Sequence, residues 1–426
     1  MISKFPPDFM WGAATSSHQV EGDNFYNDWW AWETSGYTEP SGRACDHYNR
    51  FREDFRLAKE IGHNVHRFSL EWSRLERENG KWAGNEWKHY SDVINELLRL
   101  GIEPVVTLNH FTLPLWLARK GGWENENIIE HFSRFAEKAV LEYGGRVRYW
   151  ITINEPLVLA FIGYFKGEWP PGKQSFEEML YVSRNMLKAH IAAYRKMKRA
   201  AASRPGVSPP AIGLAKAVTA FHPCSGASIP DRISAHLRNE FQNHAFIKSA
   251  MQGRIHFPPY VSERLDGARA LDFIGLNYYF REFVHHKSPL KENPFGWICS
   301  KAHHYDAGKR TEMGWEIYPK GIYEVIMDFR KYGLPIMVTE NGISTYDDNV
   351  RIEYIKEHLR YILKAIEKGA PLKGYLHWSL LDNFEWAEGY KQKFGLAGVD
   401  LKTQERVVRG SARFLASVIE RGMIPS

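Results

Sequence analysis

Eight short runs of apolar residues, rich in Val, Ile and Leu, recur along the chain, and each stops near a residue that favours a turn. Such runs are typical of buried β-strands. They predict strands over these ranges: Met10 to Ser17, Asn64 to Leu70, Glu103 to His110, Val147 to Asn154, Ala211 to Val218, Asp272 to Tyr279, Pro335 to Glu340 and Leu372 to Leu380.

The segments between these runs carry apolar residues at helical spacing. Phe51, Phe55, Ala58 and Ile61, for example, fall on one face of a helix. The same spacing predicts further helices over Trp87 to Leu100, Ile128 to Leu141, Tyr323 to Phe329, Ile352 to Ile366 and Ser411 to Arg421.

Strand and helix alternate through eight units without an internal sequence repeat, which predicts an α/β fold, a (β/α)8 TIM barrel with extended loops on its C-terminal face. A doubly wound sheet is the alternative, but no GxGxxG follows the first strand. No linker divides the chain, and such barrels can exceed about 400 residues, so we expect a single catalytic domain over residues 1–426. The longest loops are expected at Ser17 to Arg43, Phe165 to Ser175 and Arg281 to Trp315.

Composition adds one positive indication. The chain has 15 Trp, 21 Tyr and 24 Phe, more than a core needs. Carbohydrate sites use such rings, because the C–H face of a sugar stacks on an aromatic plane.

The net charge of +6 is spread along the chain, and its most basic run, Arg195 to Arg204, ends a predicted helix. We therefore expect a solvated helix face there and no nucleic-acid partner.

The three cysteines, Cys45, Cys224 and Cys299, are widely spaced and form no CxxC pair. This spacing argues against a disulfide framework or a cysteine metal site, and for a reducing compartment. The sequence begins without an apolar signal region, and no run is long enough to span a membrane. We expect a cytoplasmic protein with no membrane partner, no cofactor and no metal; the oligomeric state is left open.

Two glutamates follow β-branched runs in matching positions: Glu155 in ITINEP and Glu340 in IMVTENG. Either one alone would be read as a polar strand end. In a barrel of parallel strands, however, all C-terminal ends open on one face, so that the two can converge there. Two converging carboxyl groups are typical of a hydrolytic site.

Other predicted strand ends deliver polar and aromatic groups to the same face. A barrel that served only as a scaffold would not need them. They are His18, Gln19 and Glu21; Arg67; Asn109, His110 and Phe111; Asn154; Asn277, Tyr278 and Tyr279; and Trp378, Asp382, Asn383, Glu385 and Trp386.

An ordered set of motifs resembles glycoside hydrolase family 1, the β-glucosidase and β-glycosidase family. The motifs are FMWGAATSSHQVEG, RFSLEWSR, TLNHFTLP, TINEP, GLNYY, MGWEIYP, VTENG and WSLLDNFEWAEGY, and they span nearly the whole chain. The resemblance implies a retaining β-glycosidase that removes terminal non-reducing β-D-glycosyl residues from a small glycoside or oligosaccharide through a covalent glycosyl-enzyme.

The resemblance also implies roles for the catalytic residues. Glu340 would be the nucleophile, and Glu155 would protonate the leaving oxygen and then deprotonate water, with the two carboxyl groups roughly 5 Å apart. Arg67 and Tyr279 would keep Glu340 ionised and oriented. Asn154 would hold the sugar 2-hydroxyl.

The remaining matches imply a sugar pocket. Gln19, His110 and Glu385 would bind ring hydroxyls, Trp378 would form a stacking floor and Trp386 a wall. Trp315 would line the leaving-group side, although an ordinary packed Trp is nearly as good an interpretation. Phe111, which stands where many members have Trp, and Asn277 complete the predicted substrate site.

Several alternatives stay open at this stage. A β-galactosidase, β-fucosidase, β-mannosidase or transglycosylating enzyme would share most of the pocket, and a non-catalytic sugar-binding barrel is a remote possibility. The 6-phosphosugar branch resembles this chain but carries Ser in place of Glu385, with Lys and Tyr in place of Gln392 and Phe394; the thioglucosidase branch has Gln in place of Glu155.

A metal-dependent barrel hydrolase would need clustered ligands at strand ends. Of 18 His, only His18 and His110 lie at predicted strand ends, whereas the pairs His285/His286 and His303/His304 lie in a predicted loop. At most a weak adventitious metal site is expected.

Overall fold

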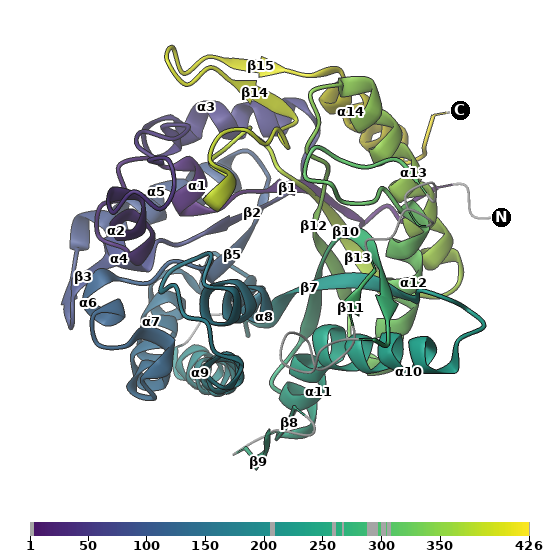
Figure 1. Cartoon of the computed structure of the whole chain (residues 1–426). Helices are drawn as coiled ribbons and strands as arrows, with labels where there is room; N and C mark the ends of the chain where they lie inside the picture. The colour runs from purple at the N-terminus through teal and green to yellow at the C-terminus, as the bar shows by residue number, and fades with distance from the viewer. Residues whose placement is uncertain are drawn as a thin grey trace.

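The computed structural model describes residues 4–204, 209–257, 261–265, 268–287, 297–299, 304 and 308–425. Eight parallel strands close into a barrel, because the last strand pairs with the first and β7 pairs with β10 (Figure 1). They are β1 (Met10–Ala14), β2 (Val65–Ser69), β5 (Glu103–Asn109), β6 (Tyr149–Asn154), β7 (Ala211–Pro223), β10 (Phe273–His285), β12 (Ile336–Asn341) and β13 (Leu372–Trp378). The predicted (β/α)8 barrel is confirmed.

Long helices surround the barrel (Figure 1). They are α3 (His47–Glu60), α5 (Gly84–Arg99), α7 (Asn127–Tyr143), α9 (Phe176–Ala202), α10 (Ile229–Arg238), α11 (Ala245–Gln252), α12 (Pro319–Phe329), α13 (Asp348–Glu367) and α14 (Gly410–Arg421). A large apolar core fills the space between strands and helices. The amphipathic pattern of the helices is explained by this packing.

A second apolar cluster lies inside the barrel itself. Seven strands contribute one buried residue each, and Met10 of β1 packs against them; the seven are Val65, Val105, Ile151, Ala215, Phe273, Met337 and Leu376. Side chains on a strand alternate between faces, so the residues two positions after Val65 and Val105, Arg67 and Thr107, also point inward. The apolar layer therefore supports a polar layer nearer the C-terminal ends.

On the C-terminal face, two of the segments predicted as loops contain regular secondary structure. The segment from Ser17 to Arg43 contains two helices, α1 (Ser17–Val20) and α2 (Asp28–Thr34). Strands β7 and β10 run past the barrel rim because they continue to pair from Ala220 to Pro223 and from Arg281 to Val284. The predicted loop from Arg281 therefore begins inside β10 and includes β11 (Trp297–Ile298); its residues 288–296, 300–303 and 305–307, with His303, lie outside the described residues.

Shorter elements complete the chain: α4 (Trp72–Leu75), α6 (Leu115–Ala118), α8 (Pro156–Leu159), and the hairpins of β3 (Glu76–Glu78) with β4 (Lys81–Trp82), β8 (Arg254–Phe257) with β9 (Val261–Arg264), and β14 (Ala397–Val399) with β15 (Arg406–Val408). Within the part of the chain that the structure describes, no helix combines the length and apolar character that crossing a membrane would require.

Candidate active site

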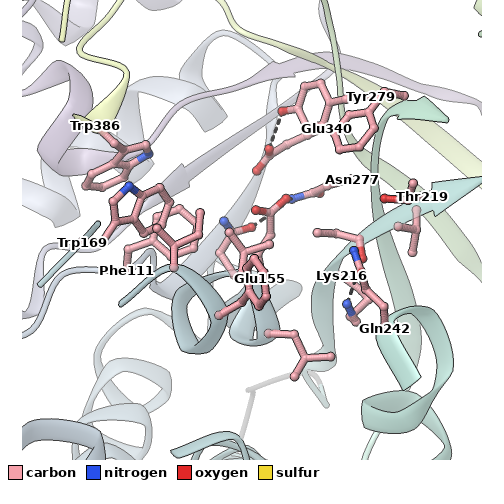
Figure 2. Close-up of a pocket in the computed structure, with 18 of the residues that line it drawn as sticks. Phe111, Glu155, Trp169, Lys216, Thr219, Gln242, Asn277, Tyr279, Glu340 and Trp386 are labelled. Atoms are coloured by element: carbon pink, nitrogen blue, oxygen red, sulfur yellow. Dashed lines mark hydrogen bonds between the residues drawn. The ribbon is translucent and has the colours of Figure 1, made fainter. Parts of the chain in front are cut away.

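A cavity of about 470 Å³ opens at the C-terminal ends of the strands. Figure 2 shows Glu155 and Glu340 turned toward it from different strands, with aromatic rings on one side. A third carboxyl group, that of Glu385, also lines the cavity. Many of the strand-end residues predicted from sequence thus meet in one pocket, whereas Glu21, Asn109, Asp382 and Asn383 do not line it.

Glu340, near the end of β12, is 4% exposed and bound on both oxygens. Arg67 Nη1 donates to its Oε1 at 2.6 Å, and the Tyr279 hydroxyl donates to its Oε2 at 2.6 Å. Arg67 is itself fully buried, and its Nε donates to Thr107 Oγ1 at 3.0 Å. A cation and an O–H donor fixed in this way favour the carboxylate form of Glu340.

Glu155 follows β6 and is the N-cap residue of α8, with Pro156 at the first helical position. Its backbone has φ 43° and ψ 55°, in the left-handed region. A non-glycine residue there is strained, and strain of this kind gathers at functional sites. Phe111 and Trp386, also on the cavity wall, have φ of 75° and 51°. Three residues that line the cavity therefore have a strained, left-handed backbone.

A chain of hydrogen bonds joins the two glutamates. Asn277 Nδ2 donates to Glu155 Oε1 at 2.8 Å and to Asn154 Oδ1 at 3.1 Å. Arg67 Nη2 donates to the same Asn154 oxygen at 2.7 Å. Arg67, which also holds Glu340, therefore fixes both carboxyl groups through a single rigid network.

The two carboxyl groups have unequal surroundings. Burial, followed by the negative charge of Glu340, raises the pKa of Glu155 to about 8. Burial also raises the pKa of Glu340, but Arg67 and the Tyr279 O–H oppose that rise directly. Among the residues described, no Lys or Arg forms an ion pair with Glu155. The pair therefore holds one ionised and one protonated member near neutral pH.

Glu385 lies farther along the wall with Trp378 and Trp386. Burial, followed by the charge of Glu340, raises the pKa of Glu385 to about 8. Gln19 is fully buried just behind it and donates to the Phe384 carbonyl at 2.8 Å and to Glu385 Oε2 at 3.4 Å.

His110 completes this wall. Its ring lies nearly parallel to those of Trp378 and Trp386, at centroid distances of 5.8 and 6.2 Å. Burial, followed by the Arg67 charge, holds the pKa of His110 well below its usual value. A neutral imidazole with Nε2 3.2 Å from the Asn154 amide nitrogen fits a hydroxyl-binding site better than a charged one.

Of the thirteen site residues predicted from sequence, eleven line the cavity and two, Arg67 and Gln19, lie buried beneath it. The cavity-lining members are His110, Phe111, Asn154, Glu155, Asn277, Tyr279, Trp315, Glu340, Trp378, Glu385 and Trp386.

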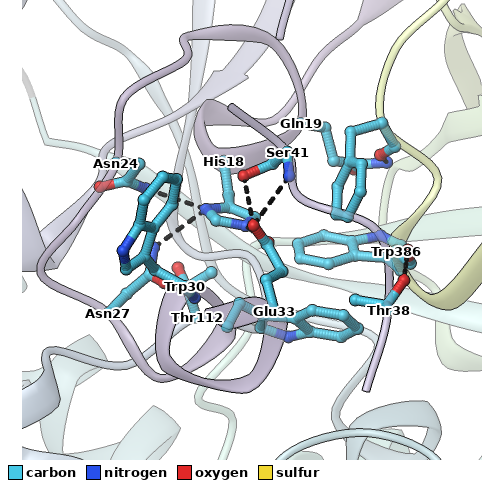
Figure 3. Close-up of polar contacts among 12 residues, drawn as sticks. His18, Gln19, Asn24, Asn27, Trp30, Glu33, Thr38, Ser41, Thr112 and Trp386 are labelled. Atoms are coloured by element: carbon cyan, nitrogen blue, oxygen red, sulfur yellow. Dashed lines mark hydrogen bonds and ion pairs between the residues drawn. The ribbon is translucent and has the colours of Figure 1, made fainter. Parts of the chain in front are cut away.

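His18 was expected at the cavity face but lies behind it. Its Nε2 lies 2.7 Å from Glu33 Oε1, and Glu33 also accepts from the backbone N–H and the hydroxyl of Ser41 (Figure 3). The His18 ring stacks on Trp386 at 5.7 Å. His18 therefore supports a wall of the pocket instead of lining it. Tyr278 likewise turns away, since its hydroxyl donates to the Tyr318 carbonyl at 2.7 Å.

Among the pocket residues that the sequence analysis missed are Lys216 on β7 and Trp169, which lies shortly after the π-helix Ala160–Lys166 that continues α8. Lys216 is fully buried, and its Nζ donates to the Ala217 carbonyl at 2.8 Å. Figure 2 shows it on the same side of the cavity as Glu155. The signal that was available is a lone Lys inside an apolar strand.

A closed barrel whose C-terminal face carries two unequal carboxyl groups among aromatic rings is a glycoside hydrolase architecture. The family model for Glycosyl hydrolase family 1 matches residues 1–423. The chain is similar to β-glucosidase A from Thermotoga maritima, 34% identical over 453 residues with 98% of each chain covered.

Solved structures agree with this match. A β-glycosidase from Pyrococcus horikoshii superposes with a TM-score of 0.92 at 37% identity, covering 100% of this chain and 97% of that one. A β-glucosidase from Thermotoga maritima in complex with glucoimidazole superposes with a TM-score of 0.89 at 32% identity, covering 99% and 100%. The chain belongs to glycosyl hydrolase family 1. Its activity is that of a retaining β-glycosidase, as predicted from the motifs.

Proposed function

We propose that this retaining β-glycosidase uses Glu340 as nucleophile and Glu155 as general acid and base. The observation that carries the proposal is the asymmetry of the pair: Glu340 is bound by Arg67 and Tyr279, whereas Glu155 has no ion-pair partner among the described residues and a pKa raised to about 8 by burial and by the Glu340 charge.

In the first step, a Glu340 oxygen attacks the anomeric carbon while the bond to the leaving oxygen breaks, and the Glu155 proton moves to that oxygen. The product of this step is an α-linked glycosyl ester of Glu340. In the second step, Glu155 takes a proton from water, the water oxygen attacks the anomeric carbon, and Glu340 leaves. Two inversions return the β configuration.

The same network supports roles in sugar binding. Asn154 would bind the 2-hydroxyl, because Arg67 and Asn277 fix its amide within the pair. Gln19, His110 and Glu385 would bind the other ring hydroxyls, with Trp378 and Trp386 as stacking surfaces. On the leaving-group side, Trp315, whose ring lies 5.4 Å from that of Tyr279, would contact the aglycone, whereas Phe111 would belong to the sugar pocket, because its ring packs beside those of His110 and Trp386.

We further propose that β-glucosides without a phosphate group are the preferred substrates. The Glu340 carboxylate in this pocket disfavours a dianion, and Glu385 stands where the 6-phosphosugar branch has Ser. Gln392, where a phosphate-binding branch has Lys, is buried between Ser344 and Glu388. A panel of nitrophenyl β-gluco-, galacto-, fuco- and mannosides and a β-glucoside 6-phosphate, compared by kcat/KM, tests this. The highest value is expected for the plain glucoside; a preference for the phosphate would reject this branch assignment.

The nucleophile is tested with Glu340→Gly. Turnover should fall by about four orders of magnitude or more, because covalent catalysis is lost. Added azide should restore cleavage of an activated nitrophenyl glycoside and give an α-glycosyl azide. Proton NMR of the wild-type reaction should show the β-sugar first.

Glu168→Gly is the matched control, because Glu168 also lines the cavity but is exposed; its activity should stay near that of the wild type. An initial α-sugar from the wild type, or near-full activity of a folded Glu340→Gly protein, would overturn the assignment.

A further inference from the structure

Two cysteines far apart in the sequence meet on the outer part of β10. Cys224 directly follows β7, and its backbone N–H donates to the Val284 carbonyl at 2.8 Å. Cys299 directly follows β11, and its N–H donates to the neighbouring Phe283 carbonyl at 2.8 Å. The backbone of β10 therefore fixes both cysteines, one from each neighbouring strand.

The side chains of these cysteines converge with a histidine. The two Sγ atoms lie 3.2 Å apart, and His304 Nε2 lies 3.3 Å from Cys224 Sγ. The ring of His304 is held by stacking on Phe283, with centroids 3.9 Å apart and planes 7° apart. Cys299 and His304 are each only 8% exposed. Three N and S donors are thus oriented toward one another in a largely buried place.

A carboxylate and a second imidazole also lie near Cys224. Ligand atoms of Cys224, Asp231 and His285 are all within 4.8 Å of one another, as are those of Cys224, Cys299 and His304. Asp231, in the first turn of α10, is 2% exposed; it accepts from His286 N at 2.8 Å and from Ser225 N at 3.2 Å, and its Oδ1 lies 2.5 Å from His286 Nδ1. Cys224 is therefore shared between two groups of possible ligands.

We propose that Cys224, Cys299 and His304 bind a Zn²⁺-type cation, with Asp231, His285 or water in the fourth position. Two thiolates and an imidazole are the ligands that zinc prefers, in tetrahedral geometry. Sulfurs about 2.3 Å from one tetrahedral ion are about 3.8 Å apart, so that the observed pair needs to separate only slightly. A covalent S–S bond of about 2.05 Å would need a larger approach.

The position of the cluster suggests what the ion would do. It lies where β7, β10 and β11 run past the barrel rim (Figure 1). In or next to these stretches of β7 and β10, Thr219, Phe280 and Glu282 line the cavity. An ion there would join three strands outside the reacting centre. Its contribution is to the stability of the rim and not to bond cleavage.

The test is metal content of the full-length protein. Wild type is incubated with Zn²⁺, desalted and analysed by elemental mass spectrometry; one zinc per chain is expected. Co²⁺ in its place should give a thiolate-to-cobalt charge-transfer band. Both signals should be lost in Cys224→Ser and in Cys299→Ser. Zinc should also raise the unfolding midpoint, and a chelator should reverse the rise.

Cys45→Ser is the matched control and should keep the zinc, because Cys45 is buried elsewhere with its Sγ directed to the Asp382 carbonyl. Turnover of a nitrophenyl glycoside reports folding of each variant. Zinc retained in both cysteine variants would mean adventitious binding and would overturn the proposal. A wild-type protein that stays metal-free after incubation with Zn²⁺ and has three titratable thiols would also overturn it. A single titratable thiol in the unreduced, denatured wild type would replace the metal site with a disulfide.

Discussion

At the scale of single residues, the unexpected member of the pocket is Lys216. A buried ammonium without a carboxylate at contact distance is costly, and burial lowers the pKa of Lys216 to about 7, with the Glu155 charge acting in the opposite sense. In turn, the Lys216 charge lowers the pKa of Glu155. Lys216 therefore belongs to the electrostatics of the proposed acid/base although it touches neither oxygen.

Lys216→Met tests this coupling through the pH profile. On the basic side, kcat/KM should fall as Glu155 loses its proton, with a pKa of about 8 in the wild type. Because the pKa of Lys216 is about 7, this residue keeps only part of its positive charge in that pH range. Removing this remaining charge makes ionisation of Glu155 harder, so the basic limb should move slightly to higher pH. Lys166→Met, at the exposed rim of the cavity, should leave the limb in place. A limb that stays put or moves down in Lys216→Met would show that Lys216 does not act on Glu155.

At the scale of elements, α1 and α2 hold the wall formed by Trp386. His18 of α1 stacks on the indole and meets Glu33 of α2, while Ser41 supplies two more donors to that carboxylate. Glu33 is 2% exposed, so each of its partners depends on it. The segment after β1 thus supports the Trp386 wall of the pocket through the contacts of His18, Glu33 and Ser41, and is not an open loop.

Glu33→Gln should weaken the support of the Trp386 wall without removing a group that contacts the sugar. The amide offers one acceptor oxygen instead of two, which leaves a buried donor of His18 or Ser41 unpaired. We expect KM to rise roughly 3- to 10-fold with kcat less affected, equivalent to about 1 kcal/mol of binding energy. Steady-state kinetics on a nitrophenyl glucoside measures this.

The control for Glu33→Gln is Glu130→Gln, whose side chain is 73% exposed beside Lys196 and should be kinetically silent. An unchanged KM in Glu33→Gln would show that the contacts of Glu33 with His18 and Ser41 do not contribute to sugar binding.

At the scale of the whole molecule, the apolar layer inside the barrel supports the polar network above it. Leu376 is fully buried in this layer. Leu376→Ala should lower the free energy of unfolding by about 2 to 5 kcal/mol, because it removes buried surface and leaves a cavity. Chemical denaturation measures the loss, and activity per folded molecule should be largely kept.

Leu98→Ala, on α5 and 38% exposed, is the matched control and should cost much less. Equal losses for the two substitutions would mean that the inner layer does not carry the stability assigned to it.

The sequence by itself determined the strands, the order of the barrel and the chain positions at which polar groups meet. Runs such as ITIN before Glu155 and IMVT before Glu340 are local patterns, and parallel closure brings all strand ends to one face. For this reason Glu155, Glu340 and the groups around them could be predicted together, and the ordered motifs identified the family.

Only the tertiary structure decided which side chains turn inward and which distant segments touch. Lys216 lies in an apolar strand whose sequence does not show which face meets the cavity. His18 turns away from the cavity because its ring nitrogens find Glu33, Asn24 and Asn27 behind the wall. Cys224 and Cys299 are close only because β7 and β11 both run beside β10 beyond the barrel rim. Such contacts depend on closure and side-chain direction across many residues, and no local pattern encodes them.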